Sequence, residues 1–558
     1  MAFKHIGEIA YVIPRLRTGE ELLSVTTSVC PYCYRVLPAV IVERDGRVYI
    51  RKVCPEHGEV EELYYGDVAF YKRVLGFHEE GRGTRHVYTP AVTTCPFNCG
   101  LCSMHKQHTA LVNLVVTNRC DLSCWYCFFY SEAAGYVYEP TLDQIREMVR
   151  SIKKQGVTVA IQLTGGEPLI REDLVEIVKL MRDEGVRHIQ LNTNGLKFAR
   201  LYLEDPAEAV KYARELRENG VNTVYLSFDG VSPRTNPKNH WEVPFILEVF
   251  RQTKMTSVVL VPTVIKGVNT DELGDIVRFA ARNIDIIRAV NFQPVSLTGF
   301  MKRFEREKYR ITIPEVSKLI EEQTGGEVSR EDWFPVNASV VFSRFIEGFS
   351  GEFKFEMSNH PICGVGTYVY VERSGEGLKL TPITRFIDVE GLLEYLRDRW
   401  VDLVTGSSRL IAGVKLLYTI RKFIDGEKAP REFDIYKLLF NIIVKRSYEA
   451  LGELHYKLLF LGQMHFMDLY NYDIQRVQRC NIHYSVPDGR LIPFCAFNIF
   501  EDVYRDKVMK EYSLSLDDYA RKYGLPREKA FPKHLRDVKR MESHELYKKT
   551  YAEFLGFK

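Results

Sequence analysis

The sequence lacks an excess of charge of either sign. Its 558 residues include 76 Lys and Arg against 73 Asp and Glu, which leaves a formal net charge of +3. Proteins that bind nucleic acid through their overall charge carry a clear basic excess. The composition therefore gives no reason to expect nucleic acid as a partner.

Long apolar runs and biased segments are also missing. No stretch reaches the roughly 20 apolar residues that a membrane-spanning helix needs. The N-terminal residues MAFKHIGEIAYVIPRLRTGEELL contain no apolar run long enough for a signal peptide. We therefore expect a cytoplasmic protein, and the absence of Pro/Ser-rich linkers leaves its domain boundaries unmarked by composition.

Cysteine, by contrast, is abundant and clustered. Nine of the 12 cysteines lie between Cys30 and Cys127. Because a cytoplasmic compartment keeps thiols reduced, clustered cysteines there more often bind metal than form disulfides. Cys30, Cys33, Cys54 and His57 are spaced as C-x2-C, x20, C-x2-H. This spacing is typical of zinc ribbons and rubredoxin-like knuckles, so residues 1–75 are expected to hold one zinc or iron ion.

Residues 111–300 alternate short β-branched runs with helical patterns. One helical pattern begins at Thr141, with Gln144 positioned for a capping box, and stops at Gly156. The β-branched runs begin at Leu111, Val157, His188, Asn222, Ser257 and Ala289. Six strand–helix units in a row predict an α/β fold, a partial (β/α)6 TIM-like barrel whose working end lies at the carboxyl ends of its strands.

Two cysteine triplets share one spacing. CDLSCWYC carries Cys120, Cys124 and Cys127, and CPFNCGLC carries Cys95, Cys99 and Cys102. A 4Fe-4S cluster normally takes four thiolates, so a loop with three leaves one iron open to a small molecule. The second triplet follows the first barrel strand, whereas the first triplet lies outside the repeat. Position therefore favours Cys120, Cys124 and Cys127 as the reactive set; a structural zinc or an electron-transfer cluster is the alternative.

Polar residues mark the tips of the next strands. LTGGEPLI follows the second strand, where Gly165 and Gly166 permit close backbone approach to a ligand and Glu167 is able to pair with an amino group. The third and fourth strands end in LNTNG and LSFDG. Their polar tips are Asn192, Asn194, Ser227 and Asp229. We expect all of them to face one cavity.

CDLSCWYC on the first strand with GGEP on the second resembles the radical S-adenosylmethionine (SAM) superfamily. The resemblance implies that Cys120, Cys124 and Cys127 hold a 4Fe-4S cluster whose open iron binds SAM. It implies a cofactor site formed by Tyr126 near the adenine, by Gly165, Gly166 and Glu167 at the methionine amino group, and by Asn192, Ser227 and Asp229 elsewhere. A reduced electron donor such as ferredoxin is then a partner, and the product of cleavage is a 5'-deoxyadenosyl radical.

The remaining cysteines indicate further clusters. They are Cys95, Cys99 and Cys102 in a segment at 76–110, and Cys363, Cys480 and Cys495 beyond the barrel. These six cysteines could hold two auxiliary clusters with three cysteines each, or one cluster with four cysteines and two spare thiols. We favour the first arrangement. His105, His108 and His483 are candidates for missing ligands.

The part of the chain at 301–558 has helical periodicity and is expected to be a C-terminal auxiliary-cluster domain. Two of its apolar stretches have a basic edge, IAGVKLLYTIRKFI from Ile411 and YKLLFNIIVKR from Tyr436. Such stretches are usually helices that face a core. A surface that contacts lipid, or the wall of an apolar tunnel, is the alternative reading.

The complete layout, with CPYC and CPEHG, CPFNCGLC, HPICGVGTY and DGRLIPFC, resembles the archaeal tetraether lipid synthase group. That resemblance implies joining of the terminal carbons of two phytanyl chains of archaeal diether lipids, with a lipid substrate and peripheral contact with a membrane. Similar architectures also serve radical methylation of a pterin or another small molecule, which we keep as the alternative. A multicluster electron carrier is the non-enzymatic alternative, against which GGEP and the six strands argue.

Overall fold

The computed structural model describes residues 4–556 apart from 130–133, 158, 302–304, 375–376, 432 and 434–455. The apolar stretch that begins at Tyr436 lies outside the described residues. The stretch that begins at Ile411 forms most of helix α12 (Arg409–Thr419) and the turn after it.

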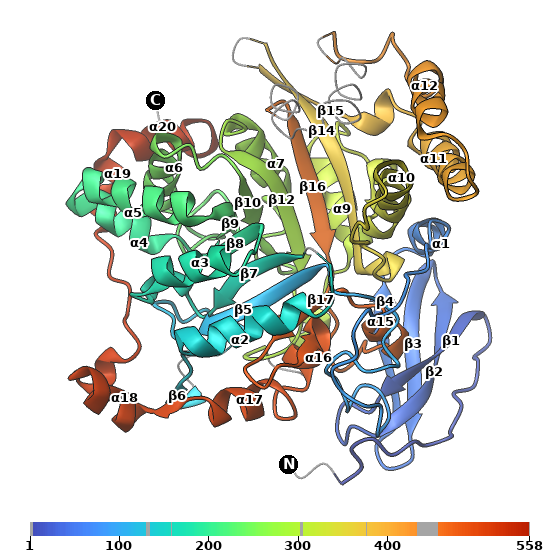
Figure 1. The fold of residues 1–558 in the computed structure, drawn as a ribbon, viewed down its shortest axis with the longest axis horizontal. Helices are drawn as coiled ribbons and strands as arrows, with labels where there is room; N and C mark the ends of the chain where they lie inside the picture. Colours follow the sequence, from blue (N-terminus) through green and yellow to red (C-terminus); the bar gives the residue numbers. More distant parts are fainter. Residues whose placement is uncertain are drawn as a thin grey trace.

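The N-terminal module is a four-stranded antiparallel sheet, the ribbon, at the lower right of Figure 1. Its strands are β1 (Glu21–Val29), β2 (Val36–Arg44), β3 (Arg47–Cys54) and β4 (Gly58–Tyr65), in sequence order. Asp45 and Gly46 join β2 to β3 with φ of 52° and 73°. An Asp-Gly pair with two positive φ angles is a favoured two-residue hairpin turn. Helix α1 (Val68–Leu75) follows, capped by Asp67.

Six parallel strands form the barrel, as the sequence predicts. They are β5 (Leu111–Thr117), β7 (Ala160–Gly165), β8 (His188–Thr193), β9 (Val221–Ser227), β10 (Val258–Val261) and β12 (Ile287–Pro294), with the short β11 (Thr263–Val264) beside β12. They pair in sequence order. The barrel helices are α2 (Leu142–Lys153), α3 (Leu174–Asp183), α4 (Leu196–Glu204), α5 (Pro206–Asn219), α6 (Val243–Gln252) and α7 (Leu273–Arg282). The expected capping box of Thr141 and Gln144 is formed.

The region after residue 301 supplies strands as well as helices. β16 (Leu458–Met464) pairs in parallel with β12, and β17 (Ile482–Ser485) in parallel with β5, so the C-terminal part flanks the barrel sheet on both sides (Figure 1). Further strands are β13 (Phe334–Pro335), β14 (Gly364–Ser374), β15 (Gly377–Pro382) and β18 (Leu491–Pro493). Helical periodicity alone missed these strands, because short apolar runs such as LLFLGQM read equally as strand or buried helix. The division at residue 300 stays a prediction.

Helices of the C-terminal part lie between and beyond these strands. They are α8 (Arg306–Tyr309), α9 (Ile313–Gln323), α10 (Val340–Ser350), α11 (Val389–Val404), α12, α15 (Ile474–Gln478), α16 (Phe494–Ile499), α17 (Arg505–Glu511), α18 (Leu516–Tyr523), α19 (Val538–Ser543) and α20 (Glu545–Leu555). β19 (Leu514–Ser515) pairs with β6 (Tyr136–Val137). Among the described residues, no helix combines the length and apolar character needed to span a membrane.

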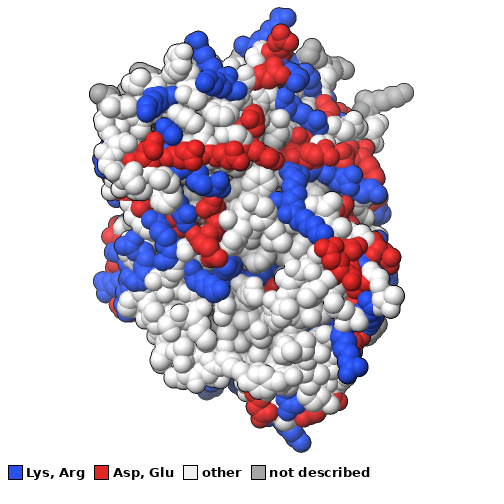
Figure 2. All heavy atoms as spheres, turned by 90° about the vertical axis from the view of Figure 1, so that its right-hand side faces the viewer, with Lys and Arg blue, Asp and Glu red and all other residues white. Residues whose placement is uncertain are grey.

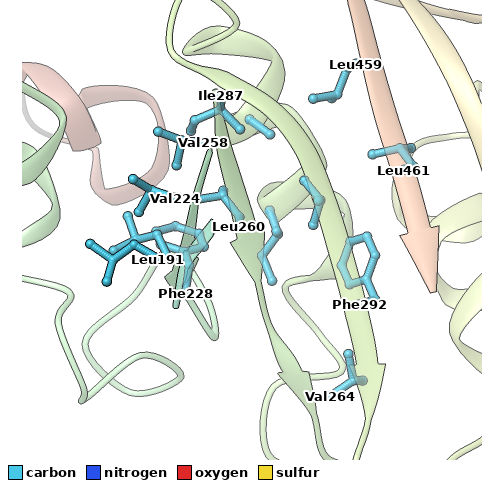
Figure 3. Packing of buried hydrophobic residues seen from close by; sticks show 14 of the residues in the cluster. Leu191, Val224, Phe228, Val258, Leu260, Val264, Ile287, Phe292, Leu459 and Leu461 are labelled. Carbon is cyan, nitrogen blue, oxygen red and sulfur yellow. The ribbon is translucent and has the colours of Figure 1, made fainter. Parts of the chain in front are cut away.

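The main core lies between the sheet and its helices. Figure 3 shows Leu191, Val224 and Leu260 of the barrel strands packed in one layer. Leu459 and Leu461 of β16 belong to the same cluster. Complete burial of such a side chain contributes about 1.5–3 kcal/mol, so the sheet is one packed unit from the barrel strands to β16.

The ribbon docks on the loop that follows β16. Lys52 of β3 donates through Nζ to the carbonyls of Leu469, at 3.2 Å, and Tyr470, at 2.9 Å. Asp473 accepts the hydroxyls of Thr26 and Tyr64, each at 2.6 Å. These buried polar contacts fix the ribbon against the carboxyl ends of the barrel strands.

Candidate active site and metal centres

The loop with Cys120, Cys124 and Cys127 directly follows β5, and all three side chains line one cavity. The Cys127 amide donates to the Cys124 carbonyl at 3.1 Å and closes a turn. Cys120 Sγ accepts from the Leu122 amide at 3.5 Å, and Cys127 Sγ from the Phe129 amide at 3.3 Å. Amide donors to sulfur are typical of Fe–S loops, and three thiols at one cavity fit a 4Fe-4S cluster with an open iron.

Gly165 and Gly166 hold this loop against the end of β7. The Gly166 amide donates to the Thr117 carbonyl at 2.9 Å, and the Glu167 amide to the Arg119 carbonyl at 2.7 Å. A Cβ on Gly165 would lie 2.0 Å from the Thr117 oxygen, and one on Gly166 would lie 2.1 Å from the Arg119 oxygen. The sequence reasoning gave these glycines a close approach to a ligand; the approach that the structure describes is to the backbone of the cysteine loop.

Glu167 is buried at the bottom of the cavity. Its carboxylate accepts the Thr193 hydroxyl at 2.6 Å and the amides of Leu169, at 2.9 Å, and Asn194, at 2.7 Å. Burial, and then the Asp121 carboxylate, raise the pKa of Glu167 to about 8. A cation that enters the cavity will favour the ionised form, so Glu167 is built to gain charge as a positive group binds.

Tyr126, Asp229 and Lys238 form a polar cluster in the wall. The Tyr126 hydroxyl donates to Asp229 Oδ2, and Lys238 Nζ lies 2.8 Å from the same oxygen. The Thr263 amide donates to Asp229 Oδ1 at 2.9 Å. Burial opposes the charge of Lys238, but the Asp229 and then the Cys124 charges outweigh it and raise the pKa of Lys238. The wall therefore keeps a lysine charged beside the cysteine loop.

The cavity measures about 200 Å³. It is lined by nearly all of the barrel residues predicted to form the site: Cys120, Cys124, Tyr126, Cys127, Gly165, Gly166, Glu167, Asn192, Asn194 and Ser227. Asp229 is not in the lining, because its carboxylate lies behind Tyr126 and Lys238.

The lining also includes residues that were not predicted, among them Lys238, Gln293 and Phe466. Gln293 is a polar tip of β12, so extending the strand-tip argument to the sixth strand finds it. Lys238 lies in the long connection after β9, and Phe466 follows β16, far along the chain. Nothing in the local sequence of either residue points to the cavity.

The ribbon metal site has tetrahedral spacing. The ligand atoms of Cys30, Cys33, Cys54 and His57 all lie within 4.8 Å of one another. Cys33 and Cys54 sulfurs are 3.9 Å apart, and His57 Nδ1 lies 3.5 Å from Cys30 Sγ and 3.4 Å from Cys54 Sγ. Metal–sulfur bonds of about 2.3 Å in a tetrahedron place sulfurs roughly 3.8 Å apart, so the four residues fit a single zinc or iron ion.

Two further groups of cysteines lie beside the barrel. All 12 cysteines of the chain are described, and none forms a disulfide. Cys95, Cys99 and Cys102 line one small cavity against the residues before β17. The second group is Cys363, Cys480 and Cys495. Burial raises the pKa of Cys495 and of Cys480. The charge of Cys480 raises the pKa of Cys495 further, and the charge of Cys363 raises the pKa of both. That these six cysteines hold two separate auxiliary clusters stays a prediction.

Polar residues surround the second group. Arg476 Nε, deeply buried, donates to Cys363 Sγ at 3.3 Å. Of the histidines considered as ligands, His105 Nε2 lies 2.6 Å from the Cys480 carbonyl oxygen and 3.3 Å from His483 Nε2. His108 accepts the Glu356 amide at 3.0 Å. Arg476 thus places a positive charge beside the Cys363 thiol, a contact that the spacing of the sequence did not predict.

Comparisons with known proteins agree with this architecture. The model of the Radical SAM superfamily matches residues 114–280, and that of the HMPTM N-terminal zinc ribbon domain matches residues 22–66. The 7,8-dihydro-6-hydroxymethylpterin dimethyltransferase of Methanocaldococcus jannaschii is 42% identical over 512 residues, covering 90% of this chain and 97% of that protein. The Bos taurus molybdenum cofactor biosynthesis protein 1 is 28% identical over 50% of this chain and 42% of its own length.

Among solved structures, Streptococcus suis SuiB matches with a TM-score of 0.30 and 17% identity, over 39% of this chain and 46% of that chain. The family models and the M. jannaschii relative carry the assignment. The chain is a radical SAM iron–sulfur enzyme, whose cofactors are a 4Fe-4S cluster and SAM, with a metal site in its ribbon. It belongs to the radical SAM superfamily, in the family that includes the M. jannaschii protein.

Proposed function

We propose that this chain methylates a pterin by radical SAM chemistry. The observation that carries the proposal is the 42% identity to the M. jannaschii pterin dimethyltransferase across 97% of that protein. The match to the HMPTM zinc ribbon model at residues 22–66 supports it independently of the barrel. These comparisons favour the pterin over the lipid reaction that the tetraether resemblance implies.

The barrel cavity supplies the residues for the first step. Cys120, Cys124 and Cys127 would hold the 4Fe-4S cluster, which when reduced supplies the electron that cleaves SAM to a 5'-deoxyadenosyl radical. Glu167 would receive the amino group of SAM, because ionisation of its buried carboxyl is favoured by a cation. Tyr126, Asn192 and Ser227 are the candidate contacts for the rest of SAM.

Aromatic residues close the cavity toward the auxiliary cysteines. Phe128, Phe129 and Phe466 line it, and Phe466 stacks on Phe494 with ring centroids 4.1 Å apart. Phe494 is the residue before Cys495. A wall of apolar rings excludes water from a radical and protects it from side reactions. We assign the two auxiliary cysteine groups to Fe–S clusters behind this wall, supplied with electrons by a reduced donor such as ferredoxin.

Methyl incorporation tests the proposal. Full-length protein is reconstituted anaerobically with iron and sulfide, reduced, and incubated with 7,8-dihydro-6-hydroxymethylpterin, SAM and a methyl donor labelled with carbon-13. We expect a labelled, methylated pterin by mass spectrometry and 5'-deoxyadenosine in proportion to it. Release of 5'-deoxyadenosine without methylated pterin under any donor tested would refute the pterin assignment while leaving the radical SAM assignment intact.

A second candidate function is the joining of lipid chains, and one observation favours it. The segment before β1 and β1 itself expose apolar side chains: Tyr11 is 82% exposed, Ile13 70% and Val25 57%. Figure 2 shows few charged side chains over the lower half of the face that includes the ribbon. An exposed apolar surface of this kind is typical of contact with a partner or a lipid surface. The two extra cysteine groups would then hold a carbon radical between two hydrogen abstractions.

Archaeal diether lipid distinguishes the two candidates. Incubation with this lipid in place of the pterin yields, for chain joining, a product that has lost two hydrogens per new C–C bond. Cys363→Ala, Cys480→Ala and Cys495→Ala should then abolish the joined product while SAM is still cleaved. An unchanged lipid mass after extensive SAM cleavage eliminates this candidate.

A further inference from the structure

A second cavity lies beside the barrel cavity and is not used by the chemistry described above. It measures about 380 Å³. Its polar lining consists of Tyr34 from the ribbon, Thr298, Tyr470, Glu501, Asp502 and Asp506, and the rest of its lining is mostly apolar. Small-molecule sites usually measure about 300–1,000 Å³. The barrel cavity is the site assigned above to SAM, so the second cavity is a separate space for an acceptor molecule.

One segment connects the two cavities. Residues 293–296 after β12 line the barrel cavity, and residues 297–299 line the second one. Gly299 packs on the cysteine loop so closely that an added Cβ would lie 2.5 Å from the Cys127 carbonyl oxygen. The Phe300 amide donates to that same oxygen at 3.1 Å. The second cavity therefore adjoins the loop that carries the cluster ligands.

Thr298 indicates that the cavity takes a polar ligand. Its side chain is 8% exposed and lines the cavity, and its hydroxyl has no hydrogen-bond partner among the described residues. Leaving a buried hydroxyl unpaired costs about 1–3 kcal/mol, so such groups usually have a partner. A ligand in the cavity supplies one.

The carboxylates define the chemistry of that ligand. Glu501 and Asp506 both pair with Arg505, at 3.1 and 3.0 Å, and Glu501 also accepts the Gly299 amide at 3.0 Å. Asp502 lines the cavity and accepts the Tyr34 hydroxyl at 3.2 Å. An ionised carboxylate only accepts hydrogen bonds, so it selects a ligand edge that donates them.

The ribbon builds one wall of this cavity. Tyr34 directly follows the metal ligand Cys33, has a φ of 61°, and its amide donates to the Cys30 carbonyl at 3.1 Å. Tyr470, which also lines the cavity, accepts a hydrogen bond at its carbonyl from Lys52 of the ribbon at 2.9 Å. The metal knuckle thus positions an aromatic residue in the wall of the cavity.

The geometry points to this second cavity as the binding site of the acceptor, a planar nitrogen heterocycle whose hydrogen-bond-donating edge faces Asp502 and whose acceptor atom receives the Thr298 hydroxyl. The inference rests on the proposed function, because the 2-amino-4-oxopyrimidine edge of a pterin carries two adjacent donors. The ribbon is then part of the substrate site, and its metal acts on substrate binding.

Direct binding tests the inference. Reconstituted full-length protein is titrated with 7,8-dihydro-6-hydroxymethylpterin under anaerobic conditions, and binding is followed by the fluorescence of the pterin. Asp502→Asn is expected to raise the Kd for the pterin at least tenfold, because an NH2 group, which donates hydrogen bonds, replaces one carboxylate oxygen, which accepts them. Thr298→Val, which keeps the shape and removes the hydroxyl, should also weaken binding, and Thr298→Ser should restore it. Iron content checks that each variant is folded.

Asp517→Asn is the matched control, since Asp517 is an exposed carboxylate on α18. Its Kd should equal that of the unsubstituted protein. Equal affinity in Asp502→Asn and Thr298→Val overturns the assignment of this cavity and leaves pterin methylation standing. Absence of pterin binding by the unsubstituted protein overturns both.

Discussion

Gly166 shows how a single residue sets the geometry of the barrel cavity. Its missing side chain lets β7 reach the cysteine loop, where any Cβ would lie 2.1 Å from the Arg119 oxygen. We predict that Gly166→Ala displaces the loop and lowers 5'-deoxyadenosine release at least about tenfold, because small misplacements at a reacting centre cost up to about 100-fold. Iron content and SAM cleavage, measured on the same reconstituted sample, check the prediction.

Gly426→Ala is the control for this change, because a Cβ on Gly426 meets no atom within 4 Å. It should leave iron content and SAM cleavage unaltered. If Gly166→Ala retains full cleavage, the close packing of the two loops has no role in holding the cluster.

Asp229 is the counter-charge of a buried lysine. Lys238, 11% exposed in its side chain, lies 2.8 Å from an Asp229 oxygen. Removing one partner of a buried ion pair typically costs about 3–5 kcal/mol. We predict that Asp229→Asn lowers the melting temperature and weakens SAM binding. The double variant Asp229→Asn with Lys238→Met should recover most of the stability, since it removes the unpaired charge; no recovery would show that Asp229 acts through Tyr126 or Thr263 instead.

At the residue scale, the sequence predicts those parts of the site that depend on local spacing. Cys120, Cys124 and Cys127 come from one loop, and Glu167 follows a strand, so their meeting is readable from the order of elements. Lys238 and Thr298 carry no such signal. Lys238 lies in an irregular connection, and the importance of Thr298 depends on its having no partner, which only the folded structure reveals.

The ribbon knuckle is the element that connects metal binding to the second cavity. We predict that Cys54→Ala, which removes one of the four ligands, releases the metal and lets Tyr34 leave the cavity wall. KM for the pterin should rise about tenfold with a smaller change in kcat, because the change affects binding of the acceptor rather than SAM cleavage. Metal analysis and steady-state kinetics check this, and His57→Cys, which preserves four ligands, should retain both metal and KM.

Helix α20 docks on the barrel through a neutral histidine. His240 is fully buried, stacks on Tyr551 at 4.3 Å, and its Nε2 lies 2.8 Å from the Tyr547 hydroxyl. Burial, and then the positive charge of Arg536, lower the pKa of His240 to about 3. The unfolded chain takes up a proton below about pH 6.5, whereas the folded chain does not. The free energy of unfolding therefore decreases as the pH falls from 6.5 toward 3. At pH 5.5 the decrease is about 1.4 kcal/mol relative to neutral pH.

His240→Gln tests this pH dependence. We predict that the fall in melting temperature between pH 7.5 and 5.5 is about 3 °C smaller in the variant than in the unsubstituted protein, because glutamine does not titrate. Differential scanning fluorimetry at both pH values measures it. Parallel falls in the two proteins would mean that other groups dominate the acid response.

At the element scale, prediction succeeded for the repeat and failed for the strands that flank it. The six barrel strands lie within a few residues of the predicted runs, because each alternates with an amphipathic helix. β16 and β17 have no such context: IHYS in β17 is four residues long, and its partner β5 lies more than 360 residues earlier. Pairing over that distance is a tertiary event that local patterns do not encode.

For the molecule as a whole, Asp473, the residue that caps α15, is one polar link between the ribbon and the C-terminal part. It accepts the hydroxyls of Thr26 and Tyr64 and the Gln475 amide. We predict that Asp473→Ala lowers the first unfolding transition by about 5 °C, because two buried hydrogen bonds to the ribbon contribute about 1 kcal/mol each and the cap of α15 is lost as well. Scanning calorimetry measures the shift, and Asp517→Ala on the surface should cause none. An unaltered transition would mean that other contacts, such as those of Lys52, hold the ribbon.

The pairing of β17 with β5 also has a consequence for how the protein is made. The edge of β5 has no C-terminal partner until the ribosome has translated residue 485, by which time the knuckle ligands and Cys120, Cys124 and Cys127 have long emerged. Domains generally fold from the N-terminus during synthesis. Cys480 and Cys495 flank β17, so the group that they form with Cys363 is completed only at the end of translation. The ribbon ligands are therefore available to bind metal before the C-terminal cysteines have been synthesised.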